Sequence, residues 1–367
     1  MKRYQHIINA LLFVTFGHIA PTQACTGITL KADDGAVLLA RTMEWGEFDM
    51  NGRLMIIPRG QEFTGATPDG KPGLKWKGKY GVVGIDMLEK GLLSDGINEA
   101  GLSLALLYHP GIAEYAKYDP TKAKNSMGPT DLAQYLLTTC STVDCVKAEM
   151  EKIQVAPVVD STLGFAPPVH FIVAEPSGKE IVIEFLKGKT TINEAPLGVL
   201  TNAPTYDWHI TNLQNYINLS PVAIPNKDVK SVDFKPLGVG SGMIGLPGDF
   251  TPPSRFVRAV AFTATARNTS DGPETVYEIF RILDNFNVPL SATWGVNNPK
   301  QPKDLRSSTL WTVAYDTKNK VMYYHTQNNR RVRMVDLSKI DFASLPAVIH
   351  QPLDEKKAQD IEDRTPK

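Results

Sequence analysis

Cys25 has the clearest capacity for chemistry in this chain because of where it stands. It follows Ala24 in the segment Gln23–Leu30, where the pattern of an export signal ends. Cleavage after Ala24 would give one residue both a thiol and a free α-amine. An α-amine has a pKa of about 7.7–8.0, so near neutral pH a useful fraction is neutral and can accept the thiol proton. The position therefore predicts a nucleophile created by proteolytic processing.

The first 24 residues have the pattern of a removable export signal. Lys2 and Arg3 give a positive start, Ile7–Ala20 is mostly apolar, and Thr22–Ala24 ends in a small residue suited to signal peptidase. The apolar run is short and interrupted for a membrane span of about 20 residues. We therefore expect residues 1–24 to be removed, no stable membrane insertion, and an exported protein that is periplasmic or fully secreted.

Two other interpretations of Cys25 stay open at this point. A bacterial lipoprotein acylates the cysteine after its signal, which would make the chain a lipid-anchored binding protein. Such sites usually carry a Leu-like residue three positions earlier, where this chain has Thr22. The other interpretation is an ordinary buried or disulfide-bonded cysteine. Cys140 and Cys145 are close enough in sequence to pair, which would leave Cys25 as the odd cysteine.

Composition narrows the class of protein. The chain has 367 residues, 42% hydrophobic and 21% charged, which is enough apolar material for a substantial core. Lys plus Arg equals Asp plus Glu at 39 each, so nothing favours a nucleic acid or an anionic membrane as partner. No Cys/His cluster has zinc-ligand spacing and no Gly-rich loop resembles a phosphate cradle, so we predict no metal and no cofactor.

The elements around Cys25 predict a hairpin that gathers charge beside it. Residues 26–30 alternate as a strand, Asp33–Gly35 supplies a turn, and residues 37–41 return as a second strand. The hairpin would bring Arg41 and Glu44 close to the cysteine, where a cation favours the thiolate. An ordinary surface ion pair at a strand end is the alternative.

The rest of the chain reads as alternating groups of strands and helices. Asn202, at the end of a predicted strand, could offer its amide N–H to an oxyanion, although an Asn before a proline turn is, taken alone, more often just a turn residue. His109 reads as a partly exposed loop histidine and residues 94–101 as a tight turn. The predicted strands are 54–58, 80–87, 102–108, 170–174, 181–186, 190–192, 198–200, 307–316 and 320–325, and the predicted helices are 131–139, 142–153, 210–217, 252–266 and 273–285.

This order predicts an α+β sandwich with sheets inside and helices outside. No interior linker or repeat divides it, so we expect a single domain over residues 25–353 and a charged tail over residues 354–367.

Five ordered segments together resemble the choloylglycine hydrolase family, which contains bile salt hydrolases and penicillin V acylases. The segments are Cys25–Gly27, Arg41–Glu44, Asp95–Leu102, Leu200–His209 and Gly245–Phe256. The resemblance covers nearly the whole mature chain. It implies the N-terminal nucleophile αββα fold and hydrolysis of linear, non-peptide amide C–N bonds without a cofactor.

The resemblance also implies roles for individual residues. Cys25 would be the nucleophile and Asn202 an oxyanion donor, with the backbone N–H of Tyr108 beside it. Arg41, Glu44 and Arg255 would order the charged shell, although many family members have Asp where this chain has Glu44.

The resemblance further indicates substrates and assembly. Tyr108 stands where many bile salt hydrolases have Asn and penicillin V acylases can have Tyr, which favours penicillin V-like acyl amides. N-acyl-homoserine lactones are a plausible natural class, and conjugated bile salts are the alternative. Trp45 and Tyr108, with Met43 and Met87, could form the acyl pocket, although we expect Met87 to belong to the core. A homotetramer with residues 206–219 as a contact arm is also implied.

Overall fold

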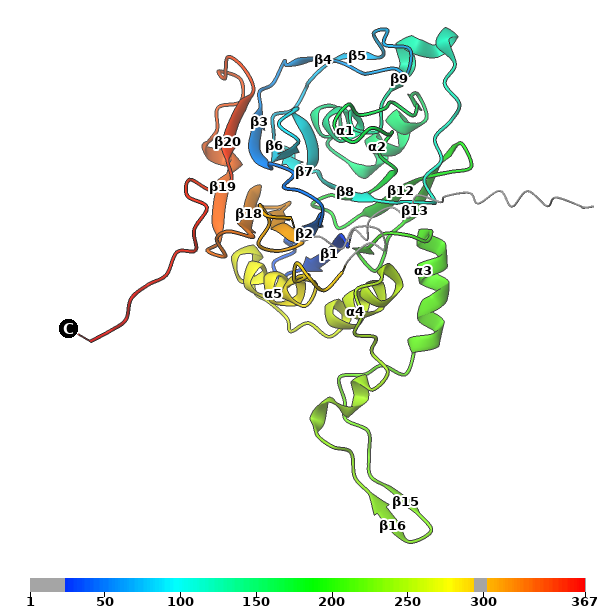
Figure 1. Cartoon of the computed structure of the whole chain (residues 1–367), viewed down its shortest axis with the longest axis vertical. Coiled ribbons are helices and arrows are strands. Elements are labelled where there is room, and N and C mark those ends of the chain that lie inside the picture. Colours follow the sequence, from blue (N-terminus) through cyan, green and yellow to red (C-terminus); the bar gives the residue numbers. More distant parts are fainter. Residues whose placement is uncertain (1–23, 294–301, 367) are drawn as a thin grey trace, which may run out of the picture.

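Two β-sheets face each other and helices cover their outer surfaces (Figure 1). The computed structural model describes residues 24–293 and 302–366. Residues 1–23 of the predicted export signal lie outside the described residues. Within them, no helix is both long enough and apolar enough to cross a membrane.

The first sheet has six antiparallel strands and carries the N-terminal hairpin. Its central strand β2 is buried along its whole length, which explains its continuous apolar start Val37–Ala40. In spatial order the strands are β14 (Val199–Leu200), β1 (Thr26–Lys31), β2 (Val37–Glu44), β17 (Thr309–Asp316), β18 (Val321–Thr326) and β19 (Arg333–Asp336).

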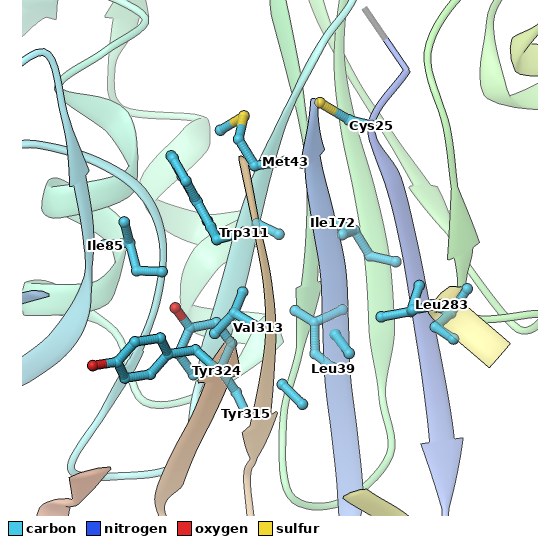
Figure 2. Packing of buried hydrophobic residues seen from close by; sticks show 14 of the residues in the cluster. Cys25, Leu39, Met43, Ile85, Ile172, Leu283, Trp311, Val313, Tyr315 and Tyr324 are labelled. Atoms are coloured by element: carbon cyan, nitrogen blue, oxygen red, sulfur yellow. The ribbon is translucent and has the colours of Figure 1, made fainter. Parts of the chain in front are cut away.

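The second sheet has eight antiparallel strands. In spatial order they are β13 (Lys189–Glu194), β12 (Glu180–Leu186), β11 (Val169–Ala174), β8 (Ser103–Tyr108), β7 (Leu92–Asn98), β6 (Val82–Met87), β3 (Arg53–Ile57) and β20 (Ile349–Pro352). Side chains from the inner faces of both sheets pack together in one core, which includes Ile85, Ile172 and Val313 (Figure 2). Cys25 and Met43 lie at the same end of this core (Figure 2).

Helices cover both outer faces. The helices α1 (Leu132–Thr139) and α2 (Val143–Met150) lie over the eight-stranded sheet, while α4 (Pro252–Ala264) and α5 (Gly272–Asp284) pack on β1, β2 and β17 (Figure 1). In α5 the apolar residues Val276, Ile279 and Leu283 recur at helical spacing and are buried. The predicted αββα sandwich in one domain is therefore confirmed.

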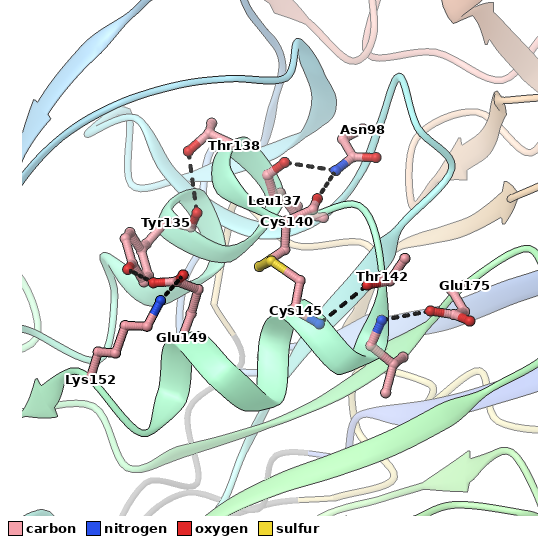
Figure 3. The surroundings of a disulfide bond; sticks show 11 residues. Asn98, Tyr135, Leu137, Thr138, Cys140, Thr142, Cys145, Glu149, Lys152 and Glu175 are labelled. Carbon is pink, nitrogen blue, oxygen red and sulfur yellow. Dashed lines mark hydrogen bonds and ion pairs between the residues drawn. A yellow bond between two sulfur atoms is a disulfide. The ribbon is translucent and has the colours of Figure 1, made fainter.

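A disulfide fixes the corner between α1 and α2. Cys140 ends α1 and is bonded to Cys145 in the first turn of α2 (Figure 3). The side chain of Asn98 donates to the carbonyls of Leu137 and Cys140, at 2.8 and 2.6 Å, so the end of β7 is tied to the same corner. The possible pairing of these two cysteines is thus realised, and Cys25 is the free one.

Two sequence-based expectations about this region are wrong. Residues 94–101 were expected to form a tight turn, but Leu92–Asn98 is strand β7. Its polar and glycine residues look turn-like because they serve tertiary contacts: a Cβ on Gly96 would lie 3.0 Å from Leu137, so α1 packs closely there. The turn is confined to Glu99–Gly101, where Gly101 has φ +94°. His109, expected to be partly exposed, is fully buried.

One short helix differs from its predicted bounds, and several short strands were not predicted. Helix α3 (Tyr206–Asn212) begins four residues earlier than expected, and the stretch after it contains a hairpin, β15 (Lys227–Val229) and β16 (Val232–Phe234), that projects from the sandwich (Figure 1). The remaining short strands are β4 (Glu62–Thr64), β5 (Lys75–Lys77), β9 (Ser126–Met127) and β10 (Gln154–Val155).

The C-terminal segment is partly anchored. Asp354 forms an ion pair with Arg333 at 2.5 Å and accepts a hydrogen bond from Thr326. The charged residues 355–366 are exposed and have no helix or strand. Asp354, the first residue of the predicted tail, is therefore held against the sandwich, and the boundary itself stays a prediction.

Candidate active site

The N-terminal hairpin places Cys25 beside the end of its partner strand, as expected. Thr26 lies opposite Thr42 in the antiparallel register of β1 and β2, and Gly27 lies opposite Arg41. Cys25 itself precedes β1 and is only 2% exposed. A lipid-modified anchor needs access to the membrane surface, which this buried position does not offer.

Arg41 makes a buried ion pair. Its Nη1 lies 3.1 Å from Oδ2 of Asp95, and both side chains are fully buried. Burial alone would lower the pKa of Arg41, but the negative charges of Cys25, Asp95 and Glu44 outweigh that effect and raise it. Arg41 therefore stays charged beside the thiol of Cys25.

Asp95 is a site residue that the sequence analysis missed. Its Oδ2 also accepts a hydrogen bond from Ser94 Oγ at 2.8 Å, and Oδ1 accepts one from the hydroxyl of Tyr315. These partners hold the carboxylate so that it fixes Arg41 in place. The signal was present, since Asp95 opens one of the five family-like segments, but the expected turn gave it no partner.

Arg255 connects the nucleophile with the predicted oxyanion residue. Pro252 begins α4, and one turn later the guanidinium of Arg255 donates to the carbonyl of Cys25 and, at 2.6 Å, to Oδ1 of Asn202. A further bond reaches Oγ1 of Thr26 at 2.9 Å. Burial lowers the pKa of Arg255 to about 10, so the group is still charged at neutral pH.

Asn202 is brought to the site because β14 pairs with β1, with Leu200 opposite Gly27. Its Nδ2 donates to the carbonyl of Tyr108 at 2.6 Å. An amide nitrogen carries two hydrogens, so one remains for a ligand. The N–H of His109 donates to the carbonyl of Pro168, and Tyr108 lies opposite Val169 in the same antiparallel pair of strands. Hydrogen-bonded and non-hydrogen-bonded pairs alternate in such a ladder, so the N–H of Tyr108 points away from β11.

Glu44 is a buried carboxyl with one unmatched oxygen. Its Oε1 accepts a hydrogen bond from Thr309 Oγ1 at 3.0 Å, while Oε2 has no partner among the described residues. Burial raises the pKa of Glu44 to about 7, although Thr42, Arg255, Arg41 and Thr309 all act to lower it. Glu44 is therefore part protonated at neutral pH.

A hollow opens at Cys25. Trp45 and Tyr108 form one wall, with ring centroids 5.9 Å apart in an edge-to-face arrangement. Met87, expected in the core, is 7% exposed and lines the hollow as well. Most of the lining is apolar, and its full set is Cys25, Met43, Glu44, Trp45, Met50, Met87, Leu88, Leu92, Leu106, Tyr108, Thr130, Asp160, Leu163, Pro167 and Val169.

Four of the seven predicted residues, Cys25, Glu44, Trp45 and Tyr108, thus line one hollow. Arg255 and Asn202 are hydrogen-bonded to Cys25 and Tyr108, respectively, and to each other, and Arg41 lies opposite Gly27, two residues after Cys25 in the chain. A free thiol at the start of the first strand of an αββα sandwich, beside buried cations and an apolar hollow, is the arrangement of the N-terminal nucleophile class. Within that class, residues 25–350 match the model of the linear amide C–N hydrolases of the choloylglycine hydrolase family, and the chain belongs to this family.

Known proteins resemble the chain over nearly its whole length. A bile salt hydrolase/transferase from Clostridium perfringens is 33% identical over 322 residues, which cover 86% of this chain and 93% of that protein. A solved mutant of the conjugated bile acid hydrolase from the same organism matches with a TM-score of 0.77 at 27% identity, covering 93% and 99% of the two chains. A penicillin V acylase from Agrobacterium tumefaciens matches with a TM-score of 0.70 at 27% identity, covering 90% and 92%. The chain is therefore a hydrolase of linear amide C–N bonds.

Proposed function

We propose that the mature protein is an exported acylase that starts at Cys25 and cleaves linear amides of apolar acyl groups, with penicillin V-like amides and N-acyl-homoserine lactones as its substrate classes. The observation that carries the proposal is the apolar, aromatic-walled hollow directly at the free thiol of Cys25. An aryloxyacetyl or fatty acyl group would bury its apolar surface there and place its carbonyl at the sulfur.

Removal of residues 1–24 is the first part of the proposal. Three observations support it: the export-signal pattern ends at Ala24, the family match begins at Cys25, and Cys25 is the cysteine left outside the disulfide. Formation of the Cys140–Cys145 disulfide fits an oxidising compartment, so the periplasm is the proposed location.

In the proposed mechanism the α-amine of Cys25 takes the thiol proton, and the thiolate attacks the amide carbonyl. A C–S bond forms and the carbonyl oxygen becomes an oxyanion. Collapse breaks the C–N bond, and the α-ammonium returns the proton to the leaving nitrogen. Water then attacks the thioester with the α-amine as base, and release of the acid restores the thiol.

The oxyanion would be held by the second Nδ2 hydrogen of Asn202 and the backbone N–H of Tyr108. Arg255 holds Oδ1 of Asn202 and the carbonyl of Cys25, so it sets the distance between donor and nucleophile. Arg41, fixed by Asp95, supplies positive charge to the thiolate. One oxyanion donor of this kind contributes roughly 10²–10³ to turnover.

The aromatic wall favours planar or slender acyl groups. The ring of Tyr108 packs edge-to-face on Trp45 in this wall, and Trp45 also packs edge-to-face on Phe48, at 5.5 Å between centroids. Such a wall suits a phenoxy ring or an alkyl chain. A conjugated bile salt is the second candidate, because relatives of this chain include bile salt hydrolases.

The test is hydrolysis of penicillin V, a conjugated bile salt and a long-chain N-acyl-homoserine lactone, side by side, by protein whose N-terminus is confirmed as Cys25 by intact mass. We expect the first or third to be cleaved faster than the bile salt. Cys25→Ser should fold normally and lose turnover by orders of magnitude, since an alkoxide is harder to form than a thiolate. Faster cleavage of the bile salt would overturn the substrate class alone.

We also propose that the protein is a homotetramer whose contacts include the projecting hairpin and its flanks. Apolar side chains gather there in exposed positions, namely Ile217, Val222, Val232, Phe234, Leu237 and Val239. A second copy is the expected occupant because the resemblance to the family implies a homotetramer. Sedimentation analysis of the protein and of Phe234→Lys/Leu237→Lys should show a tetramer and a smaller species, respectively.

A further inference from the structure

Three buried histidines hold the backbone on which Asn202 stands. His170 on β11 lies with Nε2 2.8 Å from the carbonyl oxygen of Thr201, and His209 on α3 lies with Nε2 3.1 Å from that of Asn202. His109, just after β8, lies with Nε2 3.0 Å from the carbonyl of Pro204. Three separate elements thus send one side chain each to the same four-residue segment.

The partners fix the state of all three rings. A carbonyl oxygen can only accept, so each Nε2 carries the hydrogen and each Nδ1 carries a lone pair. The three Nδ1 atoms are buried without a hydrogen-bond partner among the described residues. Burial lowers the pKa of His109 and His170 to about 3 and that of His209 to about 4, so the donors are neutral at working pH.

Neutral donors suit this location because Arg255 is close by. Its guanidinium binds Oδ1 of Asn202 and already has a lowered pKa of about 10. A lysine or arginine holding the same carbonyls would add another buried cation next to it. A neutral imidazole supplies the N–H without that repulsion.

A metal site is the competing interpretation of the cluster. His109, His170 and Glu184 are close enough to one another to be considered as ligands. However, the rings of His109 and His170 stack with centroids 3.9 Å apart and planes 16° apart, so their in-plane lone pairs lie in two separate, nearly parallel planes and do not converge on one ion. The Oε1 atom of Glu184 already accepts the N–H of Tyr206 at 2.9 Å. The cluster is better explained by its contacts with carbonyls.

We propose that His109, His170 and His209 are positioning residues that clamp the carbonyls of Thr201–Pro204 and so aim the amide of Asn202 at the oxyanion. The inference rests on the proposed function, because the histidines act through the oxyanion role of Asn202. They take no chemical step themselves. A small displacement of a catalytic group can cost about 10²-fold in rate. The clamp should therefore affect turnover and not substrate binding.

The experiment compares His209→Leu with His209→Gln, each alone and combined with Asn202→Ala, on the fastest substrate of the panel. Gln can place an amide N–H near the position of Nε2, whereas Leu cannot. We expect His209→Leu to lower kcat about 10- to 100-fold with KM changed less than twofold, and Gln to restore most of it. In the Asn202→Ala background His209→Leu should lower kcat no further. The same pair of changes at His170 repeats the test where the first variants do not fold.

His325 gives the matched control. It is a buried histidine on β18 whose pKa is lowered by burial to about 4, and it packs edge-to-face on Phe280, in a part of the core away from the Thr201–Pro204 segment. His325→Leu should lower the melting temperature while kcat stays within twofold. Equal losses for His209→Leu with and without Asn202, or an unchanged kcat, would overturn the clamp. Full activity of Asn202→Ala alone would instead refute the oxyanion role in the proposed function.

Discussion

Buried charge is concentrated at single residues around Cys25. Arg41, Arg255, Asp95 and Glu44 are each at most 1% exposed. Removing such groups from water is costly, and a hydrophobic replacement of a buried ion pair is often neutral or stabilising. Their presence together beside one thiol is therefore better explained by the reaction than by folding stability.

The ion pair between Arg41 and Asp95 should be sensitive to the loss of one partner. Asp95→Asn leaves Arg41 buried without its counter-charge, which costs about 3–5 kcal/mol in the free energy of unfolding. Urea denaturation measures it. The control is Asp144→Asn, which breaks an exposed pair with Lys179 of similar length, 2.8 Å, and should leave the free energy of unfolding nearly unchanged. Equal effects of the two changes would show that burial of the Arg41 pair has no energetic importance.

Glu44 should make the protein less stable as pH rises through neutrality. Its pKa is about 7 in the folded protein against 4.5 ordinarily, so the folded state binds the proton more tightly. Its stabilisation is thus full below pH 4.5 and is lost by pH 7, by about 3 kcal/mol. Relative to Glu44→Gln, the wild type should lose this much free energy of unfolding between those pH values. A constant difference between the two proteins would contradict the raised pKa.

At the scale of elements, the Cys140–Cys145 bond should contribute stability without activity. It closes a short loop between α1 and α2, on the outer face of the eight-stranded sheet (Figure 3). In the chain-entropy model so short a loop is worth roughly 2 kcal/mol. The double variant Cys140→Ala/Cys145→Ala should lose about that amount in urea denaturation while kcat is unchanged. A large loss of kcat would mean that this corner reaches the active site.

Elements with strong periodicity were predictable from sequence. The hairpin of β1 and β2, the strands β11 and β12 and the helices α4 and α5 follow alternating or helical patterns, and their positions hold within a few residues. Strand β7 was not predictable from local sequence. Its polar residues Asp95 and Asn98 bind Arg41 and Leu137, respectively, which are more than 35 residues away in the chain. Local propensity contains no information about such partners.

The site residues also divide into those that local sequence predicts and those that it does not. Cys25, Arg41 and Glu44 follow from one hairpin and could be placed together from local sequence. Asn202 and Arg255 needed the family resemblance, since strand pairing and a helix start bring them in from more than 170 residues away. The histidine clamp was missed because His109, His170 and His209 are scattered in sequence and meet only at backbone carbonyls, which carry no residue signature.

At the scale of the whole molecule, two sets of buried groups change the free energy of unfolding in opposite directions as pH rises. His109, His170, His209 and His325 have pKa values lowered to about 3 or 4 by burial, against 6.5 ordinarily. Glu44 and Glu180 have pKa values raised to about 7 by burial, against 4.5. Between pH 4.5 and 6.5 the unfolded chain therefore carries up to four extra protons on the histidines and lacks up to two on the glutamates.

The free energy of unfolding should consequently rise steeply up to about pH 6.5 and then change little. Below that value the unfolded state binds more protons, so stability rises with pH, by on the order of 1–3 kcal/mol per pH unit. Above it the unfolded chain loses its last excess histidine protons while the folded chain loses its glutamate protons, so the two effects nearly cancel. Urea denaturation at pH 5, 6.5 and 8 should show a rise followed by a plateau, with a shallower rise in His325→Gln and a continued rise up to pH 8 in Glu180→Gln. A steady rise from pH 5 to 8 would mean that the two glutamates ionise freely in the folded protein, and the hollow at Cys25 would then be far better solvated than its apolar lining indicates.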